Sequence, residues 1–137
     1  MMMHRAWQNP AYWCLAGMLT LGLAWPSAPS AQAIDPPDPF YKNLLDEARI
    51  LYQSGQHAGA IESLEIARFG FLDHPDLLLE CHVYLAVCHI QMKNPDKARA
   101  SVLEIRRMKL ENRIAALNLP QDLTAKYAEI AAKLIKT

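Results

Sequence analysis

The sequence lacks any excess of charge and is poor in cysteine, and each of these scarcities excludes a class of protein. Its 137 residues carry 14 basic and 14 acidic side chains, so the formal net charge is zero. This balance argues against a nucleic-acid-binding protein, which needs a basic surface, and against an acidic disordered tail. Three cysteines are too few for a disulfide-dense scaffold. With 52% hydrophobic residues, the chain instead predicts one small folded domain.

The N-terminus has the three regions of a secretory signal peptide. Residues 1–10 include Arg5 and no acid, residues 11–25 are uncharged and mostly apolar, and residues 26–33 are small or proline and end in Ala31-Gln32-Ala33. The apolar stretch is shorter than the roughly 20 residues that span a bilayer. We therefore predict a signal peptide over residues 1–33, cleaved after Ala33, and a periplasmic or secreted protein with no membrane span. A retained anchor is the alternative.

The chain beyond the signal peptide repeats its apolar residues at helical spacing and shows no strand-like alternation. Three prolines predict an extended lead-in over residues 34–40. Turn signals at Ser54-Gly55-Gln56, Asp73-His74-Pro75 and Asn94-Pro95-Asp96 divide the rest of the chain. We therefore predict five helices, the first ending before residue 54 and the others over residues 57–71, 75–92, 97 to about 108, and 121–135. Residues 109–119 fit either a continued fourth helix or a loop.

The predicted helix over residues 75–92 differs from the others because it is apolar on nearly every side. A helix of this kind must be covered on every side by other parts of the protein. We therefore expect it to lie at the centre of the fold.

Two copies of one spacing pattern occupy the first four predicted helices. The first copy consists of Ala48, Leu51, Gly55, Ala60, Leu64 and Ala67. The second copy repeats these spacings 38 residues later, at Ala86, His89, Lys93, Ala98, Val102 and Ile105. Self-similarity at this period is typical of helical repeat proteins. Small residues let two antiparallel helices approach closely. We therefore expect Ala48 to face Ala60 in the first copy and Ala86 to face Ala98 in the second.

This pattern resembles the tetratricopeptide repeat (TPR), with Leu85-Ala86 standing where the family has Leu-Gly. The chain departs from the family at Lys93, which replaces the turn glycine of the second copy, and at Leu64 and Val102, which replace an aromatic residue. The resemblance implies an all-α fold, an α-α superhelix of two TPR-like hairpins over residues 41–74 and 75–112, with a linker and a C-terminal capping helix over residues 113–137. A plain helical bundle is the alternative.

The histidines and cysteines of the third predicted helix invite a metal-site interpretation, which their spacing disfavours. Cys81 and Cys88, like His82 and His89, are seven residues apart, which is about 10.5 Å along a helix. Ligands on one helix share an ion at spacings of three or four residues, and a disulfide needs closer Cα atoms. We therefore predict buried core side chains here. No catalytic or phosphate-loop motif is visible, so we predict no enzymatic activity, metal or cofactor.

The resemblance implies a concave groove lined by the first helix of each repeat. Carried over by position, ten residues would line this groove: Lys42, Leu45, Arg49, Tyr52, Gln53, Glu80, Val83, Val87, Ile90 and Gln91. Val83, Val87 and Ile90 form an apolar strip that is either an exposed binding surface or is covered by Ile114, Leu117 and Leu119 or by the last helix. The sequence leaves these two possibilities open.

The function that this pattern implies is an exported TPR-like adaptor that binds a protein or peptide partner through a short concave groove. The alternative is a structural accessory subunit or homodimer that uses the same apolar strip as an assembly seam. Charge is distributed unevenly, since residues 34–92 carry three basic and nine acidic side chains and residues 93–113 carry seven basic and three acidic ones. So mild an asymmetry steers encounters without identifying a partner.

The signal-peptide prediction is checked by the mass and N-terminal sequence of the protein recovered from its native compartment. We expect a mature chain that begins at Ile34, because the peptidase cleaves after small residues such as those at Ala31 and Ala33. A mass that includes residues 11–25 would contradict cleavage and establish the anchored form.

Overall fold

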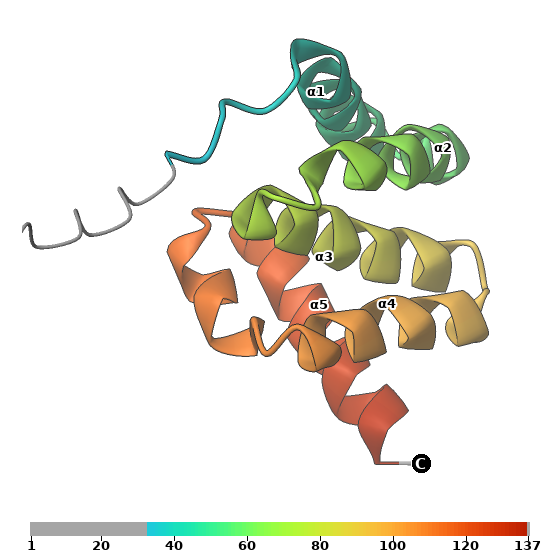
Figure 1. Cartoon of the computed structure of the whole chain (residues 1–137). Coiled ribbons are helices and arrows are strands. Elements are labelled where there is room, and N and C mark those ends of the chain that lie inside the picture. The colour runs from blue at the N-terminus through green and yellow to red at the C-terminus, as the bar shows by residue number, and fades with distance from the viewer. Residues whose placement is uncertain (1–32, 137) are drawn as a thin grey trace, which may run out of the picture. The chain divides into compact units, whose positions relative to one another are not determined.

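The computed structural model describes residues 33–136, so the predicted signal peptide lies outside the described residues apart from Ala33. The first helix begins at Pro39, and residues 33–136 contain no strand. The all-α prediction is confirmed. Figure 1 shows the elements, which are α1 Pro39–Gln53, α2 His57–Ala67, the 3-10 helix η2 Arg68–Phe71, α3 Pro75–Gln91, α4 Pro95–Arg107, the 3-10 helix η3 Glu111–Ala116 and α5 Gln121–Ile135.

Two of the helices begin at proline with a capping side chain before it. Asp38 accepts a hydrogen bond from the backbone N–H of Phe40 at 2.8 Å, and Pro39 takes the first helical position. α1 therefore starts within the lead-in predicted for residues 34–40. Asn94 caps α4 through the N–H of Lys97, and Pro95 takes the first helical position, as the Asn94-Pro95-Asp96 signal indicates.

The turns that follow α1 and α3 have one backbone conformation. Gly55 has a φ of 76° and Lys93, its counterpart in the second copy, has a φ of 58°. Equivalent backbone hydrogen bonds close both turns. In the first turn the N–H of Gln56 donates to the C=O of Leu51 at 2.8 Å, and in the second the N–H of Asn94 donates to the C=O of His89 at 2.8 Å. The sequence self-similarity therefore has a structural counterpart, even where lysine replaces glycine.

The helices pack in two pairs, α1 on α2 and α3 on α4, and the pairs meet where α2 packs on α3. α5 lies against α3 and α4. The four alanines expected inside these pairs are wholly buried, namely Ala48, Ala60, Ala86 and Ala98. Their burial is what close packing of paired helices requires, because a larger side chain would hold the helices apart.

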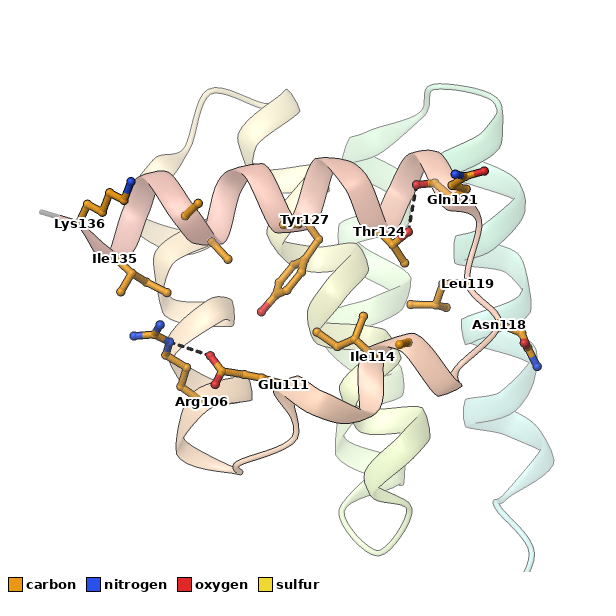
Figure 2. Close-up of a pocket in the computed structure, with 14 residues that line it drawn as sticks. Arg106, Glu111, Ile114, Asn118, Leu119, Gln121, Thr124, Tyr127, Ile135 and Lys136 are labelled. Carbon is orange, nitrogen blue, oxygen red and sulfur yellow. Dashed lines mark hydrogen bonds and ion pairs between the residues drawn. The ribbon is translucent and has the colours of Figure 1, made fainter.

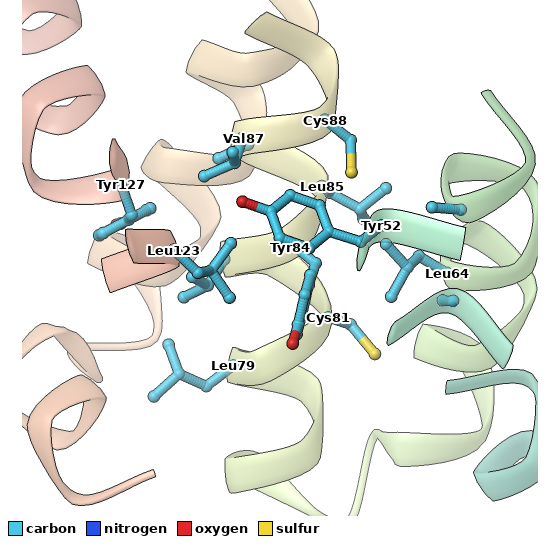
Figure 3. Packing of buried hydrophobic residues seen from close by; sticks show 14 of the residues in the cluster. Tyr52, Leu64, Leu79, Cys81, Tyr84, Leu85, Val87, Cys88, Leu123 and Tyr127 are labelled. Atoms are coloured by element: carbon cyan, nitrogen blue, oxygen red, sulfur yellow. The ribbon is translucent and has the colours of Figure 1, made fainter. Parts of the chain in front are cut away.

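α3 lies at the centre of the fold, as predicted, and Figure 3 shows part of the packing around it. Every residue from Leu78 to His89 is buried, including both histidines. Burial raises the pKa of the Cys81 and Cys88 thiols to about 12, so both are neutral at pH 7. The two cysteines are free and belong to the hydrophobic core.

Two predicted segments differ from the structure. The helix predicted over residues 57–71 is divided, because α2 ends at Ala67 and tightens into η2. Residues 109–119 neither continue α4 nor form a plain loop. Lys109 has a φ of 56°, which ends α4 in the manner of Lys93, and the chain then winds into η3. α5 has the predicted bounds.

The packing of α1 on α2 predicts opposite outcomes for two alanines of α2. Ala60→Leu should destabilise the protein by about 1–3 kcal/mol, because the added atoms enter a filled interior. Ala58→Leu, on the same helix but exposed, should stay within about 0.5 kcal/mol of the parent. Urea unfolding followed by circular dichroism measures both, and equal stabilities would contradict close packing at Ala60.

Candidate protein-binding groove

The ten residues predicted to line a concave groove do not form a free surface in this structure. Lys42, Gln53 and Gln91 are exposed, and Arg49 and Ile90 are half-buried. The other five are buried, namely Leu45, Tyr52, Glu80, Val83 and Val87. The predicted lining is therefore corrected, since half of it is unavailable to a partner.

α5 is the element that covers the apolar strip of α3. It packs on α3 and buries its own Leu123, Tyr127 and Ile130. Val83 and Val87 consequently have no exposed surface. Of the two possibilities that the sequence left open, the structure shows the covered strip.

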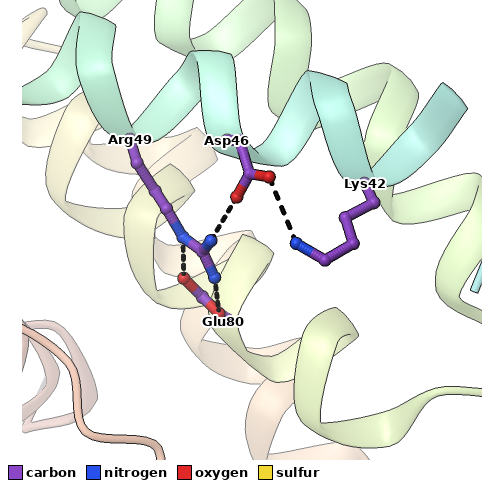
Figure 4. Close-up of polar contacts among 4 residues, drawn as sticks. All are labelled: Lys42, Asp46, Arg49 and Glu80. Atoms are coloured by element: carbon purple, nitrogen blue, oxygen red, sulfur yellow. Dashed lines mark hydrogen bonds and ion pairs between the residues drawn. The ribbon is translucent and has the colours of Figure 1, made fainter. Parts of the chain in front are cut away.

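Two charged residues of the predicted groove, Arg49 and Glu80, bind each other, as Figure 4 shows. The guanidinium of Arg49 in α1 donates two hydrogen bonds to the carboxylate of Glu80 in α3, at 2.7 and 2.8 Å. A third hydrogen bond reaches Asp46, which also pairs with Lys42 at 3.1 Å. The hydrogen bond to Glu80 is the main reason why the pKa of Arg49 is raised. This network joins α1 to α3 and leaves the buried carboxylate with its charge satisfied.

Tyr52 joins α1 to both α3 and α5. Its ring meets the ring of Tyr84 edge-on, with centroids 5.2 Å apart, and the ammonium of Lys126 lies 5.8 Å from its centroid. Burial raises the pKa of the Tyr52 hydroxyl to about 12, with the nearby Asp122 carboxylate adding to the rise. Tyr52 is therefore a neutral packing residue at pH 7.

A groove of about 820 Å³ lies elsewhere, between α5 and η3 (Figure 2). We call it the α5–η3 groove. Its apolar lining comes from Ile114 and Leu119 on one side and from the outward side of α5 on the other, where Tyr127 and Ile135 flank three alanines, Ala128, Ala131 and Ala132. Concave, mostly apolar pockets of this size are the usual places where proteins bind ligands.

The outward side of α5 differs from the corresponding sides of the earlier helices. α1 and α3 each present an alanine to a following helix, α2 or α4, and that alanine is wholly buried. On α5 the alanines at 128 and 132 are exposed and Ala131 is half-buried. Within residues 33–136 no other helix covers these alanines, so this side of α5 faces the open groove.

Charged side chains stand at one end of the α5–η3 groove. Arg106 donates a hydrogen bond to Glu111 at 2.7 Å, and the exposed Lys136 lies at the same end of the groove. These three side chains carry one net positive charge. Burial raises the pKa of the Tyr127 hydroxyl to about 12, so this ring contributes no charge. The groove therefore has an apolar floor and a mildly basic end.

Sequence reasoning missed this groove because its second wall is η3, whose path no periodicity indicates. One signal was present, since Ala128, Ala131 and Ala132 recur at helical spacing on a different side of α5 from Leu123 and Ile130. That pattern marks a second apolar face, but it does not show whether the protein itself covers the face.

Comparison with protein-family models, with curated proteins and with solved structures gives no match. In residues 33–136, no helix has the length and apolarity to cross a membrane. In the same residues, no three side chains of the metal-binding types gather at one place.

The Arg49–Glu80 pair predicts a non-additive response to substitution. Arg49→Met should lower the free energy of unfolding by about 2–3 kcal/mol, because it leaves Glu80 buried and unpaired. This loss is smaller than the about 3–5 kcal/mol expected for a fully buried pair, because 33% of the Arg49 side chain is exposed. Replacing both residues by methionine should return most of this stability. Arg107→Met, which breaks an exposed pair with Glu104, is the control and should change little. Additive losses in the double variant would contradict the pairing.

Proposed function

We propose that this protein is an exported, TPR-like adaptor that binds an amphipathic helix of a partner protein in the α5–η3 groove. The observation that carries the proposal is the unpaired side of α5. Two helices of the same chain, α1 and α3, use a buried alanine to pack against a second helix, and α5 presents three alanines beside an open groove. The occupant that this arrangement fits best is one more helix, packed on α5 as α2 packs on α1.

The character of the groove narrows the chemistry of that helix. Small or apolar residues must face Ala128 and Ala132, because alanines allow close approach and offer no polar group to bind. An acidic residue at one end of the helix would complement the net positive charge of Arg106, Glu111 and Lys136. In this proposal the protein binds its partner and catalyses no reaction. The predicted signal peptide supports a partner in the envelope or outside the cell.

A second candidate function is self-assembly, in which another copy of the chain occupies the groove. The exposed Phe40 and Ile50 of α1, at the other end of the helical array, favour this candidate because they are the apolar residues that a head-to-tail contact could bury. Such a contact does not close on itself and would make the mass distribution depend on concentration.

The test compares two exposed alanines of α5, of which only Ala128 lines the groove. A photo-crosslinking side chain placed at residue 128 should capture a partner in the native envelope, and the same side chain at residue 125 should not. With the captured protein then purified, Ala128→Gln should weaken binding at least tenfold and Ala125→Gln less than twofold, since glutamine fills the groove only at residue 128.

Sedimentation of the purified protein separates the two candidates. A monomer at all concentrations together with the residue-128 result supports the adaptor. A concentration-dependent oligomer that Ala128→Gln abolishes favours self-assembly instead. Equal effects of the substitutions at residues 125 and 128 would contradict both uses of the groove.

A further inference from the structure

The two walls of the α5–η3 groove are attached to the rest of the protein in different ways. The wall formed by α5 is anchored along its length, because Leu123, Tyr127 and Ile130 are buried in the core. Its C-terminal end is held by Arg99 of α4, whose guanidinium donates two hydrogen bonds to the C=O of Leu134, at 2.7 and 3.1 Å. A cation that bonds the last carbonyls of a helix stabilises that end. α5 is therefore a fixed wall.

The other wall, η3, buries no residue. Five of its six side chains are exposed, and Ile114, which lines the groove, is half-buried. The hydrogen bonds of a 3-10 helix also have poorer geometry than those of an α-helix. Segments with few buried apolar contacts are the ones that open locally while the rest of a protein stays folded. η3 is therefore the wall of the groove that can move.

The chain has a left-handed backbone conformation on each side of η3. Lys109, two residues before η3, has a φ of 56°, and Asn118, two residues after it, has a φ of 49°. Residues other than glycine adopt this conformation at a cost in free energy, so rotation out of it releases strain. The hinges of moving segments are a few residues at the ends of elements that absorb such rotations. Lys109 and Asn118 suit this role, and we call residues 109–118 the η3 strap.

Two exposed ion pairs hold the η3 strap against the neighbouring helices. Glu111 pairs with Arg106 of α4 at 2.7 Å, and Arg113 pairs with Asp76 of α3 at 2.7 Å. These four side chains are between 45% and 53% exposed. Exposed ion pairs contribute little to stability, and salt screens them. The closed position of the strap therefore depends on contacts that are individually weak.

We propose that the η3 strap opens about Lys109 and Asn118 to admit the partner helix into the α5–η3 groove, and closes beside it by re-forming the two ion pairs. This inference rests on the proposed function, because the partner helix is what the strap admits. Figure 2 shows Ile114 on the η3 side of the groove, facing α5. A helix in the groove would lie against Ile114 and cover the apolar surface that opening exposes. The open state is then a minor state that the partner selects.

The test measures amide hydrogen exchange in the purified protein without a partner. Two backbone N–H groups of the strap report on its opening, because Arg113 donates to the C=O of Leu110 at 2.9 Å and Leu117 donates to that of Ile114 at 3.2 Å. Both should exchange at least tenfold faster than the helical N–H of Tyr127, after correction for intrinsic rates. Raising NaCl from about 0.05 M to about 0.5 M should accelerate both by about two- to tenfold, which is the factor that two exposed ion pairs supply. Equal protection of the strap and α5, or no response to salt, would overturn the proposal.

A variant loosens the strap without changing the lining of the groove. Arg113→Met removes one ion pair at a residue that does not line the groove, and should accelerate exchange at Leu117 about two- to fivefold without affecting Tyr127. Arg107→Met removes the same charge from an exposed pair with Glu104 outside the strap, and should change neither rate. Equal acceleration by both variants, or equal acceleration at Leu117 and Tyr127, would contradict a strap that opens by itself.

The same variants test whether opening admits the partner. With the protein captured from residue 128, Arg113→Met should raise the association rate constant about two- to fivefold, because a larger fraction of molecules is open. Arg107→Met should leave this rate constant unchanged, and an equal effect of both variants would overturn the proposal. Capture at residue 128 together with a strap as protected as α5 would overturn this inference alone. A salt-sensitive strap without capture at residue 128 would contradict the proposed function and support the movable wall.

Discussion

The structure depends on the burial of α3 on every side. Every residue from Leu78 to His89 is buried, so the helix cannot be stable in water without neighbours on all faces. α1, α2, α4 and α5 supply those neighbours, and buried alanines let the paired helices approach closely enough to exclude water. The burial of α3 therefore requires apolar or small residues on the sides of the other helices that face it.

Because α3 is covered, the free surfaces of the protein lie at other places than the groove expected from the sequence. The inner faces of α1 and α3 that would line a groove are occupied by α5, by the Tyr52–Tyr84 contact and by the Arg49–Glu80 ion pair. Among the apolar surfaces that stay free are the outward side of α5 and the turn at η2 with its exposed Phe69 and Leu72. The first is long, apolar and basic at one end, whereas the second is small and the charged side chains around it form ion pairs. They therefore suit different kinds of ligand.

The two hairpin turns show how far repetition in the sequence extends into the structure. Gly55 and Lys93 occupy equivalent places and adopt the same left-handed backbone conformation, although only glycine adopts it without strain. The packing of each helix pair therefore requires this turn conformation, and the residue at the turn position adopts it whether it is glycine or lysine. Matching hydrogen bonds in the two turns show the repetition in the backbone. In the sequence the repetition is weaker, because Leu64 and Val102 stand in place of an aromatic residue.

The sequence alone determined the helices, their approximate bounds and the central place of α3, because these depend on local spacing, on caps such as Asn94, and on a face pattern that any packing must respect. It did not determine the division of α2 from η2, the winding of residues 111–116 or the covering of Val83 and Val87. Those features depend on which distant apolar faces meet, and the second apolar face of α5 left more than one pairing open. Only the tertiary structure decided that α5 covers α3 with Leu123 and Tyr127 and turns its alanines outward, because that arrangement buries the larger side chains.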